Sequence, residues 1–149
     1  MNKWYENGYG TRKNQTIIIM KVLVVCNDAF TKGNGLHTVI KSLVPRLKEA
    51  GIHVRLMSAR NADENGPQPD YPLEHFRFPV FDALIKSHSY GFAKIDRDII
   101  TEAVEWADLI HLQEGFPLEA ATARIADRAG KPIVGTFHLY SQNILFNAL

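Results

Sequence analysis

Residues that could bind a phosphate precede the first helical pattern of the chain. Gly33, Asn34 and Gly35 follow Lys32, and apolar residues at helical spacing come directly after them. Glycines let backbone N–H groups approach a ligand closely, and the positive end of a helix dipole favours an anion. This glycine loop is therefore a candidate phosphate site. A tight turn between a strand and a helix would use the same residues, and neither a dinucleotide fingerprint nor a P-loop is complete here.

Two histidines stand in or after short apolar runs and could take part in binding or catalysis. His138 directly follows residues 133–137, and His111 lies inside residues 109–112. A histidine in such a place can move a proton, orient a sugar hydroxyl or donate to a phosphate. Packing or capping is the alternative role for both. Glu114 comes shortly after His111 and could reach the same cleft, with a solvated surface glutamate as its alternative.

The cysteine and histidine spacing indicates no other chemistry. Cys26 could pair with His111 as nucleophile and base, but its surroundings carry no cysteine-hydrolase signature, and a small buried thiol is the commoner case. The six histidines are all more than ten residues apart, so we predict no metal site and no metal cofactor. A single cysteine cannot form an intrachain disulfide, which is typical of a reducing compartment and favours the cytoplasm.

Length and composition fit one globular domain. The chain has 149 residues, of which 46% are hydrophobic and 22% charged, with a net charge of +1. This near-balance gives no electrostatic reason to expect nucleic-acid binding. No stretch approaches the about 18 uninterrupted apolar residues of a membrane span. Residues 1–19 are polar and without period, so we expect a flexible N-terminal extension followed by a single domain over residues 20–149.

Strand-type and helix-type patterns alternate along that domain. Strands are predicted at residues 17–25, 53–57, 75–80, 109–112 and 133–137, and helices at residues 36–50, 96–107, 117–129 and 141–149. This alternation predicts an α/β fold, a doubly wound and mostly parallel Rossmann-like sheet with helices on both faces. Ligands of such sheets bind beyond the carboxyl ends of the strands. The glycine loop and His138 both belong to loops at that edge.

Three segments together resemble glycosyltransferase family 4. Residues 35–54 have a glycine, a helix with the pattern L-x3-L, and then Gly-Ile-His-Val. Residues 108–111 read Asp-Leu-Ile-His, and residues 132–138 read Pro-Ile-Val-Gly-Thr-Phe-His. These resemble the family's amino-terminal glycine motif, its "D-hydrophobic-hydrophobic-H" strand and its "P-hydrophobic-V-x-T-x-H" strand, in the same order.

The resemblance implies one half of a retaining GT-B hexosyltransferase, whose two Rossmann-like domains close over a cleft. The amino-terminal domain mainly binds the acceptor, and the carboxyl-terminal domain holds a nucleoside-diphosphate sugar, which is a co-substrate rather than a cofactor. By resemblance, the backbone of Gly33, Asn34 and Gly35 helps to hold the donor diphosphate, and His138 is the catalytic residue beside the reacting sugar. The resemblance also suggests candidates for acceptor binding, which are His111, Glu114, Tyr140 and Asn143.

The chain departs from the family pattern in three places. Asn34 replaces the first glycine of the family pair, and His53 stands one place later than the family's histidine. The donor half and its E-x7-E motif are not found, since no two glutamates stand eight positions apart. We therefore expect this chain to be inactive alone and to require the missing C-terminal domain.

Two alternatives stay open. The chain could be a non-catalytic, flavodoxin-like module that binds a phosphorylated small molecule or a partner domain. Its acceptor could be a glycan or a lipid, and a lipid acceptor would bring peripheral contact with the inner face of a membrane. No basic amphipathic helix in the sequence demands such contact.

Overall fold

The computed structural model describes residues 19–33, 35–76 and 91–138. It contains the strands β1 (Lys21–Val25), β2 (His53–Ala59), β3 (Tyr71–Leu73), β4 (Leu109–Leu112) and β5 (Ile133–Gly135). The helices are α1 (Gly35–Glu49), α3 (Arg97–Trp106) and α4 (Pro117–Arg128). The alternation of strands and helices expected from the sequence is confirmed.

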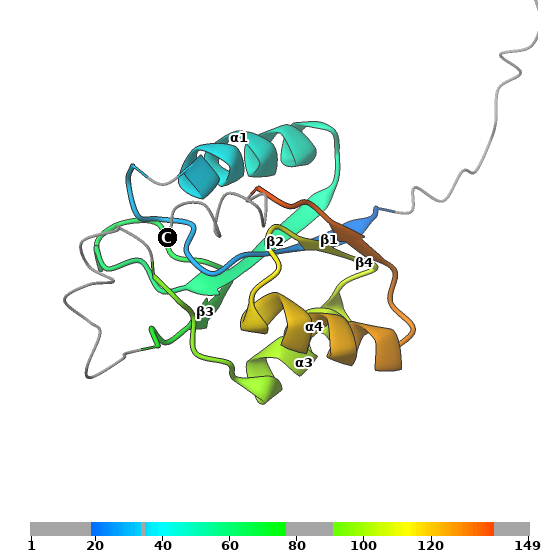
Figure 1. The fold of residues 1–149 in the computed structure, drawn as a ribbon. Coiled ribbons are helices and arrows are strands. Elements are labelled where there is room, and N and C mark those ends of the chain that lie inside the picture. The colour runs from blue at the N-terminus through cyan, green and yellow to red at the C-terminus, as the bar shows by residue number, and fades with distance from the viewer. Residues whose placement is uncertain (1–18, 34, 77–90, 139–149) are drawn as a thin grey trace, which may run out of the picture.

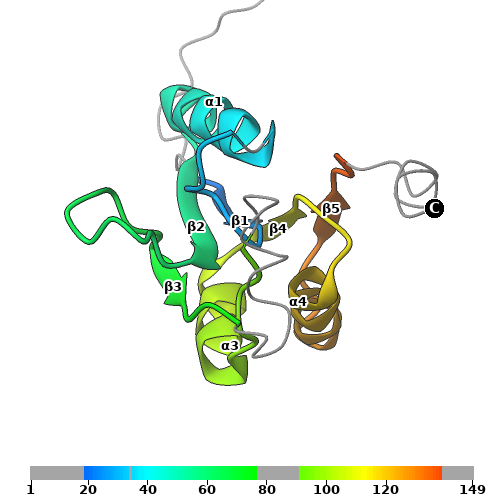
Figure 2. The ribbon, with the colours of Figure 1, turned by 60° about the vertical axis from the view of Figure 1, so that its left-hand side comes forward.

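The strands form one five-stranded sheet in the order β3-β2-β1-β4-β5, and all neighbouring strands are parallel. Helix α1 covers one face of the sheet, while α3 and α4 lie side by side on the other (Figures 1 and 2). This is the predicted Rossmann-like architecture. Since the strands are parallel, all their carboxyl ends meet at one edge, which we call the carboxyl edge.

Two hydrophobic cores hold the layers together, and β1 contributes to both. Leu23 and Val25 pack toward α3 and α4, whereas Val22 and Val24 pack toward α1. Side chains of a strand alternate between its two faces, so a strand covered on both faces must be apolar throughout. This requirement explains the continuous apolar run of β1.

The end of α1 shows why its boundary could be predicted. Gly51 has a φ of +81°, a conformation that disfavours side chains with a Cβ. The backbone N–H of Ile52 donates to the carbonyl of Leu47 at 3.1 Å, and that of Gly51 donates to Lys48 at 3.0 Å. These two bonds form a Schellman motif, in which Ile52 and Leu47 also pack in the same core.

The third strand differs from its prediction. The structure places β3 at Tyr71–Leu73 instead of residues 75–80, of which residues 77–80 lie outside the described part. His75 forms only an isolated antiparallel bridge with Ala93. Pro72 has no backbone N–H to donate, but β3 is at the edge of the sheet, where a missing N–H is tolerated.

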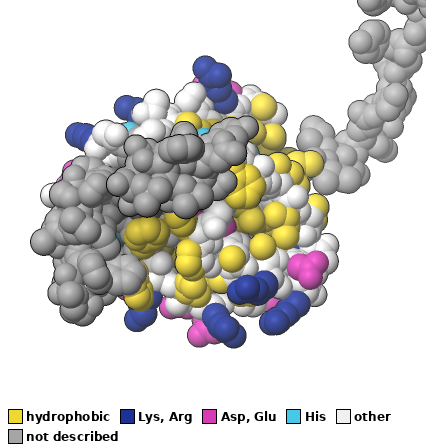
Figure 3. All heavy atoms as spheres, viewed as in Figure 1, with side chains coloured by type: hydrophobic (Ala, Val, Ile, Leu, Met, Phe, Trp, Pro, Cys, Tyr) yellow, Lys and Arg dark blue, Asp and Glu magenta, His cyan; other side chains and the backbone are white. Residues whose placement is uncertain are grey.

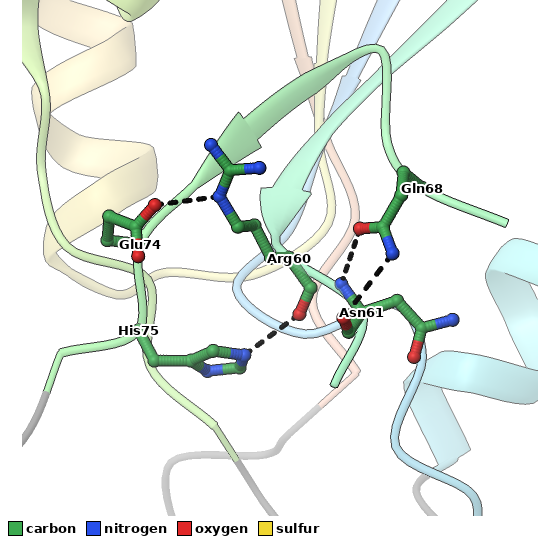
Figure 4. A network of polar contacts seen from close by, with 5 residues as sticks. All are labelled: Arg60, Asn61, Gln68, Glu74 and His75. Carbon is green, nitrogen blue, oxygen red and sulfur yellow. Dashed lines mark hydrogen bonds and ion pairs between the residues drawn. The ribbon is translucent and has the colours of Figure 1, made fainter. Parts of the chain in front are cut away.

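A polar network fastens the loop between β2 and β3 (Figure 4). The guanidinium Nε of Arg60 lies 2.7 Å from a carboxylate oxygen of Glu74, and the backbone oxygen of Arg60 accepts from Nε2 of His75 at 2.8 Å. The backbone N–H of Asn61 donates to the side chain of Gln68 at 3.0 Å. These polar contacts hold the two ends of a largely exposed loop together.

The remaining predictions agree in position but not at every boundary. β1 and β5 are shorter than the predicted strands at residues 17–25 and 133–137, and β2 extends two residues further than expected. The helix predicted at residues 141–149 and the N-terminal extension lie outside the described part, apart from residue 19. None of the helices in the described ranges has the length and apolar character that crossing a membrane requires.

The N-terminus of α3 provides a test of the fold. Asp96 caps this helix, because its side chain accepts from the backbone N–H groups of Asp98 and Ile99 at 3.0 and 3.2 Å. We expect Asp96→Ala to lower the free energy of unfolding by about 1 kcal/mol, measured by urea denaturation. The control is Glu102→Ala at an exposed position of the same helix. This variant should change the free energy of unfolding by less than about 0.5 kcal/mol. Equal losses in both variants would contradict the capping role.

Candidate functional site

Two histidines and their partners form a polar row at the carboxyl edge, between β4 and β5. Nε2 of His111 lies 2.9 Å from the hydroxyl of Thr136, and Nε2 of His138 lies 3.0 Å from Oε1 of Gln113. We call these four side chains the histidine row. The predicted site residues His111 and His138 are thus brought together in the structure.

Strand register explains this proximity. His111 pairs with Val134 and Leu112 with Gly135, so the residues that follow β4 and β5 leave the sheet side by side. The pairing continues past the strands, because the backbone N–H of Thr136 donates to the carbonyl of Leu112 at 2.8 Å. Two segments separated by some 25 residues in the chain therefore share one site.

The surroundings of His111 favour its neutral form. Burial lowers the pKa of His111, because a charged imidazole loses hydration, and the charge of nearby His138 lowers it further. A neutral imidazole has one donor and one acceptor nitrogen, so it can accept from the Thr136 hydroxyl or donate to it. His138 itself is exposed, which leaves its ring accessible to a ligand.

Gln113 is buried, and only part of its amide is satisfied. Its side chain is 1% exposed, and its oxygen faces His138. Among the residues that the structure describes, the amide nitrogen Nε2 has no hydrogen-bond partner. An unsatisfied buried donor costs roughly 1–3 kcal/mol.

A buried acidic cluster lies at the same carboxyl edge and consists of Asn27, Glu114 and Glu119. Nδ2 of Asn27 lies 3.3 Å from Oε2 of Glu114 and 3.1 Å from both carboxylate oxygens of Glu119. The backbone N–H of Asn27 also donates to Glu114 at 3.1 Å. The acidic cluster thus joins the end of β1 to the end of β4 and to the first turn of α4.

Glu119 is unusual within this cluster. Its pKa is raised from the ordinary value of 4.5 to about 7. Burial is the main cause and the nearby charge of Glu114 adds to it, while hydrogen bonds lower the pKa in part. One of these bonds comes from the backbone N–H of Phe116, which donates to Glu119 at 3.2 Å and so caps α4. Near neutral pH, Glu119 therefore exists in both protonated and charged forms.

The glycine loop occupies the carboxyl edge after β1. Lys32, Gly33 and Gly35 are exposed, and Gly33 has a φ of +89°, while Asn34 lies outside the described residues. Asp28 shapes the loop, because its side chain accepts from the backbone N–H groups of three residues, which are Phe30, Thr31 and Gly91. The first turn of α1 carries no acidic residue, so its helix dipole is not compensated there.

A pocket of about 480 Å³ opens beside the acidic cluster. Its walls are mostly apolar and consist of Asn27, Phe76, Phe92, Ala93, Lys94, Ile95, Pro117 and Leu118. Figure 3 shows that hydrophobic side chains are also prominent on one face of the surface, next to Lys and Arg side chains along its lower margin. The exposed apolar residues include Val134 and Phe137 of the β5 segment.

Cys26 has the character of a structural thiol. It is completely buried, and burial raises its pKa well above the ordinary value of 9.0. The acidic residues nearby raise the pKa further, although a hydrogen bond with Ser58 lowers it. A thiol in such surroundings is a poor nucleophile. This environment favours the buried-thiol interpretation over a Cys26–His111 pair.

The structure groups the sequence candidates in three places. His111 and His138 belong to the histidine row, Glu114 to the acidic cluster, and Gly33 and Gly35 to the glycine loop. Tyr140 and Asn143 lie outside the described residues. Within the described ranges, no three His, Cys, Asp or Glu side chains gather closely enough to hold a metal ion.

Sequence reasoning missed the partners of these residues. Gln113 and Thr136 make their contacts between neighbouring strands, so no local pattern marks them. Glu119 did leave a signal: it lies three and seven positions before Thr122 and Ala126, on the buried face of α4. A glutamate at the third helical position commonly caps a helix. The sequence therefore offers no reason to expect a second role for Glu119.

Comparison with known protein families identifies a family for this chain. The model of the family described as Glycosyltransferase Family 4 matches residues 33–147, which is more than half of the chain. The matched range begins at the glycine loop and includes both histidines of the histidine row. No curated protein matches the chain significantly.

The acidic cluster predicts a pH-dependent stability. The folded-state pKa of Glu119 is raised from 4.5 to about 7, so the folded chain holds a proton that the unfolded chain has lost in this window. This contribution to stability is complete below pH 4.5 and disappears as the pH rises to about 7. The free energy of unfolding should fall by up to about 1.4 kcal/mol per pH unit in this window.

Glu119→Gln should remove this slope, because glutamine imitates the protonated acid and does not titrate. Urea denaturation of both proteins between pH 5 and 8 measures the difference, and subtracting the two profiles removes the contributions of the histidines. The control is Glu102→Gln on the exposed face of α3, which should keep the wild-type slope. Parallel profiles for wild type and Glu119→Gln would show that Glu119 has an ordinary pKa.

Proposed function

Because the chain belongs to glycosyltransferase family 4, we propose that it is the acceptor-side domain of a retaining, sugar-nucleotide-dependent glycosyltransferase of GT-B type. Its Rossmann-like sheet is consistent with a single half of such an enzyme. In this proposal the carboxyl edge is the wall of the cleft that faces the donor-binding domain.

The histidine row is the observation that carries this proposal. His138 is exposed, its Nε2 is held by a buried side chain, and a second imidazole stands beside it. An exposed imidazole with a fixed orientation can contact a sugar hydroxyl reproducibly, which is what a reaction that depends on positioning requires. His111 and Glu114 are then the candidates of the described part for acceptor binding, together with Tyr140 and Asn143 outside it.

The glycine loop supports the other half of the proposal, the donor diphosphate. Gly33 adopts a positive φ, Lys32 is exposed beside it, and the first turn of α1 has no acidic residue. Backbone N–H groups and an uncompensated helix dipole stabilise negative charge that develops on a leaving diphosphate. Gly33, Asn34 and Gly35 would therefore help to hold the diphosphate while the other domain holds the nucleoside.

The proposal extends to partners and location. The acceptor would be a glycan or a lipid, and transfer would require a C-terminal domain with the paired glutamates. The reduced, buried Cys26 suits a cytoplasmic location. Peripheral contact with the inner face of a membrane would follow if the acceptor is a lipid.

Nucleotide titrations of the chain test this function. We expect UDP-glucose, GDP-mannose or UDP-N-acetylglucosamine to shift the amide NMR signals of Gly33 and Gly35 and the ring signals of His138. The affinity should be weak, on the order of 1 mM, because only one half of the cleft is present. His138→Ala should weaken binding of the sugar nucleotide by up to about tenfold, the worth of one hydrogen bond, and leave binding of UDP or GDP unchanged.

The matched control is His53→Ala, because His53 is exposed at the amino end of β2, away from the carboxyl edge. His53→Ala should bind the sugar nucleotides with the same affinity as the wild type. Equal affinities for His138→Ala and wild type would count against the proposed role of His138. Binding of phosphorylated compounds without any dependence on the sugar would favour a flavodoxin-like binding module. We expect no sugar transfer by the purified chain alone, and detectable transfer would contradict this expectation.

A further inference from the structure

The contact between Gln113 and His138 bears on the position of the imidazole ring and on which of its nitrogens carries the proton. Oε1 of the Gln113 amide lies 3.0 Å from Nε2 of His138. An amide oxygen can only accept a hydrogen bond, so Nε2 of His138 must carry the proton in this contact. A neutral His138 then has its acceptor lone pair on Nδ1.

The surroundings of Gln113 hold its side chain in place. The residue is 1% exposed, and its backbone N–H donates to the carbonyl of Val25 at 3.0 Å, which extends the pairing of β4 with β1. The next residue, Glu114, is fixed by Asn27. The amide therefore extends from a rigid part of the backbone toward an exposed histidine.

The amide nitrogen shows what the opposite orientation would mean for His138. In the described part of the chain, Nε2 of Gln113 is buried without a hydrogen-bond partner, which costs free energy. The opposite orientation of the amide would place this nitrogen against His138 and would require the proton on Nδ1. The direction of the amide and the tautomer of His138 are therefore coupled, and each implies the other.

We propose that Gln113 is a positioning residue that holds the proton of His138 on Nε2 and so leaves Nδ1 as the acceptor for a ligand hydroxyl. A hydroxyl can donate to Nδ1, whereas an ionised phosphate oxygen cannot. The contact selects a hydroxyl-bearing group at this place in the cleft. Its importance for sugar transfer rests on the function proposed above, but the contact and the tautomer do not.

NMR of the ¹⁵N-histidine-labelled full chain at pH 8 tests this inference. We expect the wild type to show a proton on Nε2 of His138 and none on Nδ1. In Gln113→Met, which has a similar shape but offers no amide oxygen, the Nε2 proton should exchange with water about tenfold faster, the worth of one hydrogen bond. Gln113→Glu restores an acceptor oxygen at the same reach, so slow exchange should return.

Two further measurements separate this role from a merely structural one. Gln113→Met should unfold at the same urea concentration as the wild type or a higher one, since it also removes the unpaired Nε2. The ring signals of His53 should not change in any variant. A proton on Nδ1 in the wild type, or unchanged exchange in Gln113→Met, would overturn the inference. The expected tautomer without any response to sugar nucleotides would support it and contradict the proposed function instead.

Discussion

The buried side chain of Asn27 is the interaction on which the carboxyl edge depends. Its amide nitrogen donates toward Glu114 and Glu119, and its amide oxygen accepts from the backbone N–H of Ala93 at 3.3 Å. One side chain thus connects the end of β1 with the loop after β4, the first turn of α4 and the segment before α3. Because these groups are buried, their hydrogen bonds stabilise one arrangement and make partial loss of the network costly.

This network extends by direct contact to the exposed surface. Asn27 fixes Glu114, the neighbouring residue Gln113 follows the same backbone, and its amide reaches His138. The exposed imidazole is therefore supported from the interior of the domain. A site residue whose partners are themselves buried and hydrogen-bonded keeps its orientation better than a residue held by solvent-exposed contacts.

The sequence predicted the sheet well because each strand and helix has its own local signal. Hydrophobic period, the glycine after α1 and the proline at the start of α4 mark boundaries within a few residues. The third strand was predicted at residues 75–80, but β3 lies at Tyr71–Leu73. A strand tolerates Pro72 at the edge of a sheet, and edge position is a property of the whole sheet that no local pattern shows. For the same reason the sequence placed His138 at the carboxyl edge but not Gln113 beside it: that contact depends on the register between β4 and β5.

At the carboxyl edge, the carboxylates of Asp28 and Glu119 are buried, while Lys32 is exposed. The carboxylates of Asp28 and Glu119 both accept backbone N–H groups, and Glu119 loses part of its charge near neutral pH because it is buried. α4 therefore begins with an acidic residue that compensates its dipole, whereas the first turn of α1 contains none. The carboxylates of the acidic cluster are buried, whereas Lys32 is exposed beside the start of α1. In the proposed function, a diphosphate that approaches this edge would therefore meet the exposed Lys32 and the glycine loop and not the buried acidic cluster.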